Sequence, residues 1–178
     1  ARAPGDELVA VDETPAAPQI RQSNAHAISC ALRRAGFPPA HIDTLRDDSN
    51  AELLRDRIEA CDWLVLTGAI SKGARDFIPA MLDSLGCTRV FHGVAQRPGK
   101  PAGCWVGPSG QMIMALPGNP VSVMVTFELF VRPALMKMMG RRQVFRPEVT
   151  ARLEQDVVGP KGKTQFARVR VKRTKEGW

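Results

Sequence analysis

The stretch WLVLTGAISKGARDF, residues 63–77, decides the fold. Its first five residues are mostly apolar, and they run directly into a turn that contains Gly68 and Gly73. A short apolar run that ends at glycine predicts a strand buried on both faces of a sheet. The residues after the turn look helical and carry an acid, Asp76. The stretch therefore predicts a strand, a glycine-bearing loop and a helix, which is the repeating unit of an α/β fold.

The same alternation continues along most of the chain. We expect helices over residues 20–36, 49–62, 75–86 and 119–140, and strands over residues 41–45, 63–68, 88–94, 103–107 and 111–116. The last helix has the strongest pattern, and its Pro120 lies near the first turn, where a missing N–H group costs nothing. The sequence PSG between the last two strands is typical of a hairpin turn. The alternation predicts an α/β domain whose mostly parallel sheet is flanked by helices in three layers.

The pattern changes at Arg141. Residues 141–178 alternate polar and apolar side chains, contain Gly and Pro turns and have no helical period. We interpret residues 1–140 as the α/β domain and residues 141–178 as the truncated start of a separate β domain. The chain does not begin with Met and both ends look abrupt, so we expect it to be part of a longer protein.

Composition and charge restrict the class of partner. With 44% hydrophobic and 24% charged residues, the 178-residue chain resembles an ordinary soluble globular protein. Its formal net charge of +7 favours an anionic partner. The basic excess lies mainly after Met136, where either a solvated face or an anion-binding surface would explain it. Aromatic residues make up only 6% of the chain and Tyr is absent, so we do not expect a nucleic-acid partner.

Location and metal content are also constrained. The chain has no apolar run near the roughly 20 residues that cross a bilayer, and no signal peptide, so we expect no membrane partner. The four cysteines are scattered singly, without the spacing of a zinc site. Reduced cysteines in a cytoplasmic protein are the simplest interpretation.

Three loops with glycine lie beside predicted strand ends: residues 67–74, residues 97–101 (RPGKP) and residues 116–120 (LPGNP). In α/β sheets, ligands bind beyond the carboxyl ends of the strands, where free N–H groups at helix starts favour anions. The first loop is neither a P-loop nor a dinucleotide fingerprint, and alone it would be a connection more often than a site. The three loops together predict one pocket for an anionic ligand.

These loops also carry a resemblance to a known family. TGAISKGARDF, RPGKP and LPGNPVSVMVTFELFVRPAL, in this order, resemble the molybdopterin molybdenumtransferases, which include the E domain of gephyrin. Shorter motifs are similar too: PGDEL at residues 4–8, IRQSN at residues 20–24, and the pair Asp47 and Asp48. The resemblance covers nearly all of residues 4–140, and the combination of PGKP with LPGNPVS is highly specific.

The resemblance implies a molybdopterin-binding α/β domain that acts in molybdenum cofactor biosynthesis. The implied reaction is the Mg²⁺-dependent insertion of molybdate into adenylated molybdopterin, with release of AMP. The substrates would be the pterin and molybdate. The full-length protein would be a homodimer with further N-terminal domains.

Site residues are implied by the same motifs. Glu7, Asp47 and Asp76 match the acidic positions, where they would act catalytically, with Asp47 and Asp76 as metal ligands. Taken singly, each acid would more often be a turn, cap or first-turn residue. The residues implied in substrate binding are Ser23, Asn24, Thr67, Gly68, Ser71, Gly73, Arg97, Lys100, Pro101, Gly118, Asn119, Ser122 and Arg168.

Some of these residues have a defined role in the resemblance. Arg97 and Lys100 would bring positive charge to phosphate or molybdate, and Ser122 would line the oxyanion pocket with the loop at Pro101. Arg168, in QFARVRV, would face the molybdate, although a solvated strand arginine is the commoner arrangement. Ser23 and Asn24 would lie near the substrate; a helix cap is the alternative.

The chain departs from the family pattern at three positions. Ala69 replaces the second of two adjacent glycines, Ala74 replaces an acid, and Arg97 replaces the usual lysine. The lost acid removes one possible ligand for Mg²⁺ or water, and arginine exchanges a compact ammonium for a planar fork. Two alternatives therefore stay open: a molybdopterin adenylyltransferase, and a divergent molybdopterin-binding module without catalysis.

Overall fold

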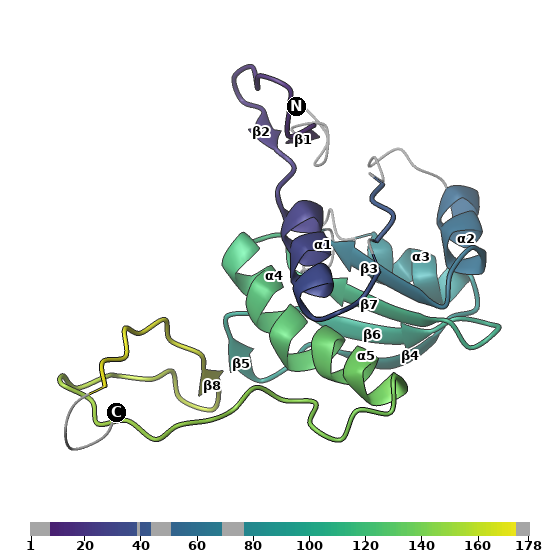
Figure 1. Ribbon diagram of the computed structural model, residues 1–178. Helices are drawn as coiled ribbons and strands as arrows, with labels where there is room; N and C mark the ends of the chain where they lie inside the picture. Colours follow the sequence, from purple (N-terminus) through teal and green to yellow (C-terminus); the bar gives the residue numbers. More distant parts are fainter. Residues whose placement is uncertain (1–7, 39, 44–50, 69–76, 174–178) are drawn as a thin grey trace.

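The computed structural model describes residues 8–38, 40–43, 51–68 and 77–173 (Figure 1). The elements in chain order are β1 (Leu8–Val9), β2 (Ile20–Arg21), α1 (Asn24–Arg34), α2 (Ala51–Glu59), β3 (Trp63–Thr67), α3 (Ile78–Ser84), β4 (Thr88–His92), β5 (Gln96–Arg97), β6 (Gly103–Val106), β7 (Met112–Leu116), α4 (Pro120–Thr126), η1 (Phe127–Val131), α5 (Arg132–Met138) and β8 (Thr164–Gln165).

The central sheet has four strands in the order β3-β7-β6-β4. β3 and β7 are parallel, whereas β7 with β6 and β6 with β4 are antiparallel. The predicted α/β class is confirmed, but the sheet is mixed rather than mostly parallel. Parallel neighbours need a crossover of a dozen or more residues, usually a helix. β6 and β7 are instead joined by the predicted hairpin turn, and the segment between β4 and β6, residues 93–102, contains no helix.

Helices cover both faces of this sheet, which confirms the three layers. Helix α1 and the segment from α4 to α5 lie on one face, and α2 and α3 lie on the other (Figure 1). Along β7 successive side chains point to opposite faces: Ile113 and Ala115 join one core, and Met114 and Leu116 join the other. Each layer of helices therefore has its own hydrophobic core.

The helix predicted over residues 119–140 is confirmed as one continuous segment made of α4, η1 and α5. Its middle is a π-turn in which the Arg132 amide donates to the Phe127 carbonyl, five residues back. The turn lies directly before Pro133, which has no N–H group to continue the ordinary bonding pattern. Wider turns of this kind are a usual way for a helix to accommodate such an interruption.

Two smaller predictions are corrected or restricted. The helix expected from residue 20 begins at Asn24, because Ile20 and Arg21 instead pair in parallel with Leu8 and Val9. The strand expected over residues 41–45 does not form in its described part, residues 41–43. The first two residues of the helix expected over residues 49–62 lie outside the described residues.

An ion pair anchors the start of the C-terminal segment to the helical layer. The Glu128 carboxylate accepts hydrogen bonds from Nε of Arg146 at 3.0 Å and from its Nη2 at 2.9 Å. Arg132, 9% exposed, donates through Nη1 to the Val144 carbonyl at 2.9 Å. The hydrogen bond from Arg146 is the main cause that lowers the pKa of Glu128.

Beyond this anchor, the chain runs away from the helical layer and returns to lie beside β5 at β8 (Figure 1). Within described residues 141–173, β8 is the one strand, and it pairs in parallel with β5. Nearly all side chains of this segment are exposed. The separate β domain stays a prediction.

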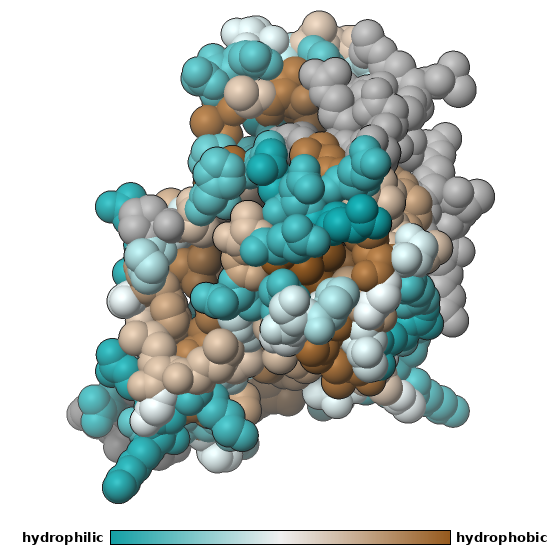
Figure 2. Space-filling model, turned by 90° about the vertical axis from the view of Figure 1, so that its right-hand side faces the viewer, coloured by the Kyte–Doolittle hydropathy of each residue, from teal (hydrophilic) through white to brown (hydrophobic). Residues whose placement is uncertain are grey.

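The surface carries both hydrophilic and apolar side chains. On the face shown in Figure 2, hydrophilic side chains gather across the middle, with apolar residues between them. Among the described residues, no helix is long and apolar enough to cross a membrane.

All four cysteines are free. Cys30 is exposed, whereas burial raises the pKa of Cys61, Cys87 and Cys104.

Candidate functional site

The loops that follow β3 and β7 touch at one edge of the sheet. Thr67 pairs with Leu116, so the two parallel strands end together. The Gly68 amide donates to the Leu116 carbonyl at 3.0 Å, and a Cβ added at Gly118 would lie 3.6 Å from the Gly68 Cα. Gly68 has φ +88°, a backbone conformation that favours glycine. The predicted meeting of these two loops is therefore present.

The loop after β7 begins helix α4 with a cap. The Asn119 side-chain oxygen accepts from the amides of Val121 at 3.0 Å and Ser122 at 3.3 Å. Pro120 occupies the first helical position, where no N–H group is needed. This arrangement fixes the direction in which the helix leaves the Gly118 loop and places Ser122 in its first turn.

Asn24 brings a third segment to the same place. As the first residue of α1, it donates through Nδ2 to the Gly118 carbonyl at 2.8 Å. Its Oδ1 is buried and has no hydrogen-bond partner among the described residues. Ser23 is the N-cap residue by position, but its side chain makes no capping bond. Of the two alternatives for this motif, the structure places Asn24 against the Gly118 loop.

The loop of residues 97–101 also reaches this edge. It leads into β6, whose first residue, Gly103, lies opposite Ala115 near the end of β7. Backbone hydrogen bonds close the loop. The Val94 amide donates to the Lys100 carbonyl at 2.8 Å, and the Ala102 amide donates to the Gly99 carbonyl at 3.1 Å. Arg97 and Lys100 are exposed, so their cationic groups are available to an anion.

Two residues that were not predicted as site residues pack against this loop. Gln96, 6% exposed, donates through Nε2 to the Pro98 carbonyl at 2.9 Å. Thr126 of α4 is fully buried, and its Cγ2 would lie 2.5 Å from a Cβ added at Gly99. The one sequence signal for Gln96 was its position as a polar residue directly before the RPGKP motif. For Thr126, which lies inside the long helix, no sequence signal indicated a contact with this loop.

The C-terminal segment passes directly beside the same loop. The Phe166 amide donates to the Arg97 carbonyl at 2.8 Å, and the Thr164 amide donates to the Ala95 carbonyl at 2.9 Å. Arg168 follows two residues later and is exposed. The structure thus brings the segment that carries Arg168 to the loop of Arg97 and Lys100. Among the described residues, no contact joins Arg168 to either cation.

The predicted acids cannot be placed in the same way. Glu7, Asp47 and Asp76 lie outside the described residues, as do Ser71 and Gly73. Among the residues that are described, no group of three or more His, Cys, Asp or Glu side chains could hold a metal ion. The metal site stays a prediction.

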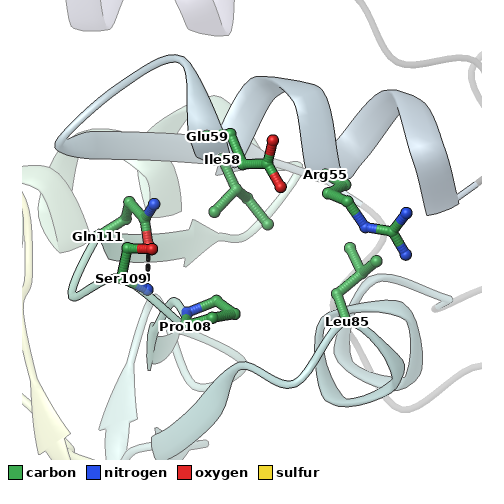
Figure 3. A pocket seen from close by; sticks show the side chains of 7 residues that line it. All are labelled: Arg55, Ile58, Glu59, Leu85, Pro108, Ser109 and Gln111. Carbon is green, nitrogen blue, oxygen red and sulfur yellow. Dashed lines mark hydrogen bonds between the residues drawn. The ribbon is translucent and has the colours of Figure 1, made fainter.

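A hollow of about 70 Å³ lies at the opposite end of the sheet, beside the β6–β7 turn (Figure 3). It is lined by Arg55, Ile58, Glu59, Leu85, Pro108, Ser109 and Gln111. Its volume is far below the roughly 300 Å³ or more of ordinary ligand pockets. The Ser109 amide donates to Oε1 of Gln111 at 3.0 Å, which orders the turn. We assign this hollow no part in the predicted site.

Comparison with known proteins identifies the family. Residues 3–137 match a family described as a probable molybdopterin binding domain. The chain belongs to this family. Its predicted resemblance to the molybdopterin molybdenumtransferases is also confirmed, because curated relatives carry that name.

Two such relatives define the extent of the match. The chain is 42% identical to a molybdopterin molybdenumtransferase of Synechococcus elongatus, over 89% of this chain and 39% of that protein. It is 38% identical to molybdopterin molybdenumtransferase 2 of Mycobacterium tuberculosis, over 92% of this chain and 42% of that protein. The chain thus spans about two fifths of the length of these family members.

Solved structures of the family agree with the fold. A molybdopterin biosynthesis MoeA protein of Pyrococcus horikoshii superposes with a TM-score of 0.67 at 26% identity, covering 90% of this chain and 38% of that one. A second MoeA structure from Pyrococcus horikoshii gives a TM-score of 0.66 at 27% identity over 78% of this chain and 34% of that one. The α/β architecture is therefore that of a molybdopterin biosynthesis protein.

Proposed function

We propose that the chain is part of a molybdopterin molybdenumtransferase that inserts molybdate into adenylated molybdopterin and releases AMP. The observation that carries the proposal is the close approach of Gly118 to Gly68 beyond two parallel strands that end together. Loops at the carboxyl ends of such strands are where α/β proteins bind phosphorylated ligands. The names of the family and of its relatives supply the identity of that ligand.

The phosphate groups of the pterin would bind to the loops at this edge. Backbone N–H groups and cations are the donors that phosphate oxygens accept from. We assign substrate binding to the glycine-bearing loops and the segments beside them, through Ser23, Asn24, Thr67, Gly68, Ser71, Gly73, Gly118 and Asn119. The contact of Asn24 with Gly118 supports the inclusion of the α1 start.

Molybdate would bind beside the cationic loop. Arg97 and Lys100 supply positive charge, and Pro101 and Ser122 line the oxyanion pocket. Arg168 approaches from the C-terminal segment, and the bond from Phe166 to Arg97 supports this assignment. Because a guanidinium offers a planar pair of donors, Arg97 can bind two oxygens of one anion.

The catalytic part of the proposal rests on three acids. Asp47 and Asp76 would hold Mg²⁺, and Glu7 would position a water at the pyrophosphate. The donor set fits the metal, since Mg²⁺ prefers carboxylate oxygens and keeps several waters. When bound, the ion would stabilise negative charge on the phosphate oxygens.

The organisation of the whole protein belongs to the same proposal. By resemblance, residues 1–140 form the pterin-binding domain and residues 141–178 begin a β domain. The intact protein would be a cytoplasmic homodimer. The switch to exposed, mainly non-helical chain after Gly140 supports the domain division.

The reaction products test the function. The intact protein is mixed with adenylated molybdopterin, molybdate and Mg²⁺, and AMP and metallated cofactor are measured. Both products are expected. Formation of adenylated molybdopterin from molybdopterin and ATP would identify an adenylyltransferase instead, and pterin binding without either reaction would identify a binding module.

The acids are tested by Asp76→Asn in the same assay. Loss of AMP release with retained pterin binding, measured by calorimetry, is expected, because an amide cannot replace the charge of a carboxylate ligand. Asp62→Asn is the matched control, since Asp62 is exposed and lies before β3, at the other end of the sheet. Equal activity of Asp76→Asn and wild type would exclude the metal assignment.

A further inference from the structure

We propose that Gln96 and Thr126 are positioning residues that hold the loop of residues 97–101 in the conformation its cations need to bind molybdate. The inference rests on the proposed function and deepens it. It adds two residues that contact neither substrate in the proposal and act through the loop.

Gln96 is a buried polar side chain with a specific partner. It is 6% exposed, and its Nε2 donates to the Pro98 carbonyl at 2.9 Å. Buried polar groups are almost always hydrogen-bonded, because an unpaired one loses its water without compensation. The bond joins the residue before the motif to the middle of the loop. It therefore restrains the backbone between Arg97 and Lys100.

Thr126 restrains the same loop from the helical layer. A Cβ added at Gly99 would lie 2.5 Å from Cγ2 of Thr126 and 2.6 Å from Nε2 of Gln96. The backbone at Gly99 is thus enclosed between the two side chains. Thr126 is fully buried, and a branched side chain has few rotamers, so its methyl group forms a fixed wall.

The hydroxyl of Thr126 ties this wall to the proposed substrate site. Its Oγ1 donates to the Ser122 carbonyl at 2.7 Å and to the Val123 carbonyl at 3.0 Å. Ser122 is the serine assigned to the oxyanion pocket. Thr126 therefore connects the cationic loop on one side with the first turn of α4 on the other.

This geometry predicts an effect on molybdate rather than on the pterin chemistry. Without the bond from Gln96, the loop and its cations, Arg97 and Lys100, would populate more conformations. Binding of the anion would then be weaker, because part of its free energy would be used to order the loop. The carboxylates that carry out the reaction belong to other segments. The half-saturating concentration of molybdate should rise while the maximal rate of AMP release changes little.

The test uses Gln96→Met in the intact protein, which keeps the length of the side chain and removes its donor. Gln111→Met is the matched control, because Gln111 orders the β6–β7 turn at the opposite end of the sheet. Two quantities are measured: amide hydrogen exchange of residues 93–102, and AMP release as a function of molybdate concentration. Thr126→Ser is the second variant; it keeps the hydroxyl bonds and removes the methyl wall.

For Gln96→Met and Thr126→Ser we expect both loop exchange and half-saturating molybdate to rise about three- to tenfold, the effect of one lost hydrogen bond or its equivalent in packing. Gln111→Met should leave both unchanged. If exchange of residues 93–102 equals wild type in both variants, the inference is wrong. If exchange rises and half-saturating molybdate does not, the loop is held but has no part in molybdate binding, which also overturns it.

Failure of the proposed function would look different. A wild-type protein that releases no AMP contradicts the transferase assignment. In that case loop exchange in the two variants still decides whether Gln96 and Thr126 hold the loop.

Discussion

At the scale of single residues, Gly99 and Gly110 illustrate two different reasons why a position requires glycine. Both have positive φ, +101° and +89°, which disfavours any other residue. Gly110 has nothing within 4 Å of an added Cβ, whereas Gly99 faces Thr126 and Gln96. The first is needed for conformation alone, and the second for conformation and space together.

This difference can be measured with Gly99→Ala and Gly110→Ala. We expect Gly110→Ala to lower the free energy of unfolding by about 1 kcal/mol through backbone strain. Gly99→Ala should lower it by about 1–3 kcal/mol more, because the added methyl overpacks a buried site. Urea denaturation of both variants gives the comparison. Equal losses would show that Thr126 moves away without cost.

Asn119 offers a second test at this scale. Its side chain accepts from two amides at the start of α4, and loss of such a cap costs about 1 kcal/mol. Asn119→Ala should therefore lower the free energy of unfolding by about that amount. Asn119→Asp keeps the accepting oxygen and adds a charge that a helix N-terminus favours, so it should be near wild type. An equal loss in both variants would contradict a capping role.

At the scale of elements, the anchor between Glu128 and Arg146 joins the α4–α5 segment to the chain that follows. Because Arg146 lowers the pKa of Glu128 in the folded protein, the pair stabilises the fold at pH values above the ordinary glutamate range. That stabilisation is lost as the pH falls through the lowered pKa, when the carboxylate becomes protonated.

Glu128→Gln tests this dependence. Near about pH 7 the variant should be less stable than wild type. The difference should shrink as the pH falls through the lowered pKa of Glu128, below which wild type also carries a neutral side chain. Urea denaturation across this range gives the difference. Glu148→Gln, at an exposed position two residues beyond Arg146, is the control. A difference that does not change with pH would show that Glu128 acts by packing alone.

The elements themselves were predicted unevenly. The strands at residues 63–67 and 112–116 could be found because each is a nearly unbroken apolar run, and the long helix because its period extends over the whole element. The two-residue strands β1, β2, β5 and β8 are too short to have a period. Their pairing, such as that of Arg97 with Gln165, depends on contacts between distant parts of the chain.

At the scale of the molecule, the predicted meeting of loops is present although the sheet is mixed. The prediction assumed a mostly parallel sheet with a hairpin turn between the last two strands, and β6 is antiparallel to both β7 and β4. The start of β6 therefore lies beside the end of β7, and the loop before β6 still reaches the site. The shared packing of Gln96 and Thr126 against Gly99 could not be predicted from the sequence, because it depends on how the loop folds onto α4.

The net charge of +7 makes the proposed binding of anions sensitive to salt. Raising NaCl from about 0.05 M to about 0.5 M should increase half-saturating molybdate several-fold, since the screening length falls from roughly 14 Å to about 4 Å. Arg97→Gln should weaken binding and reduce this sensitivity. Arg55→Gln, in the small hollow at the other end of the sheet, should leave both unchanged. Equal salt sensitivity of Arg97→Gln and wild type would remove Arg97 from the site.

The distribution of the cysteines has a practical consequence. Maleimide dyes react with thiolates, so the raised pKa values of Cys61, Cys87 and Cys104 slow their labelling at neutral pH. Cys30 is exposed on α1, about 9 Å along the helix axis from Asn24, which contacts the Gly118 loop. The unmodified chain can thus accept one fluorophore beside the proposed pterin site, where its emission would report ligand binding directly.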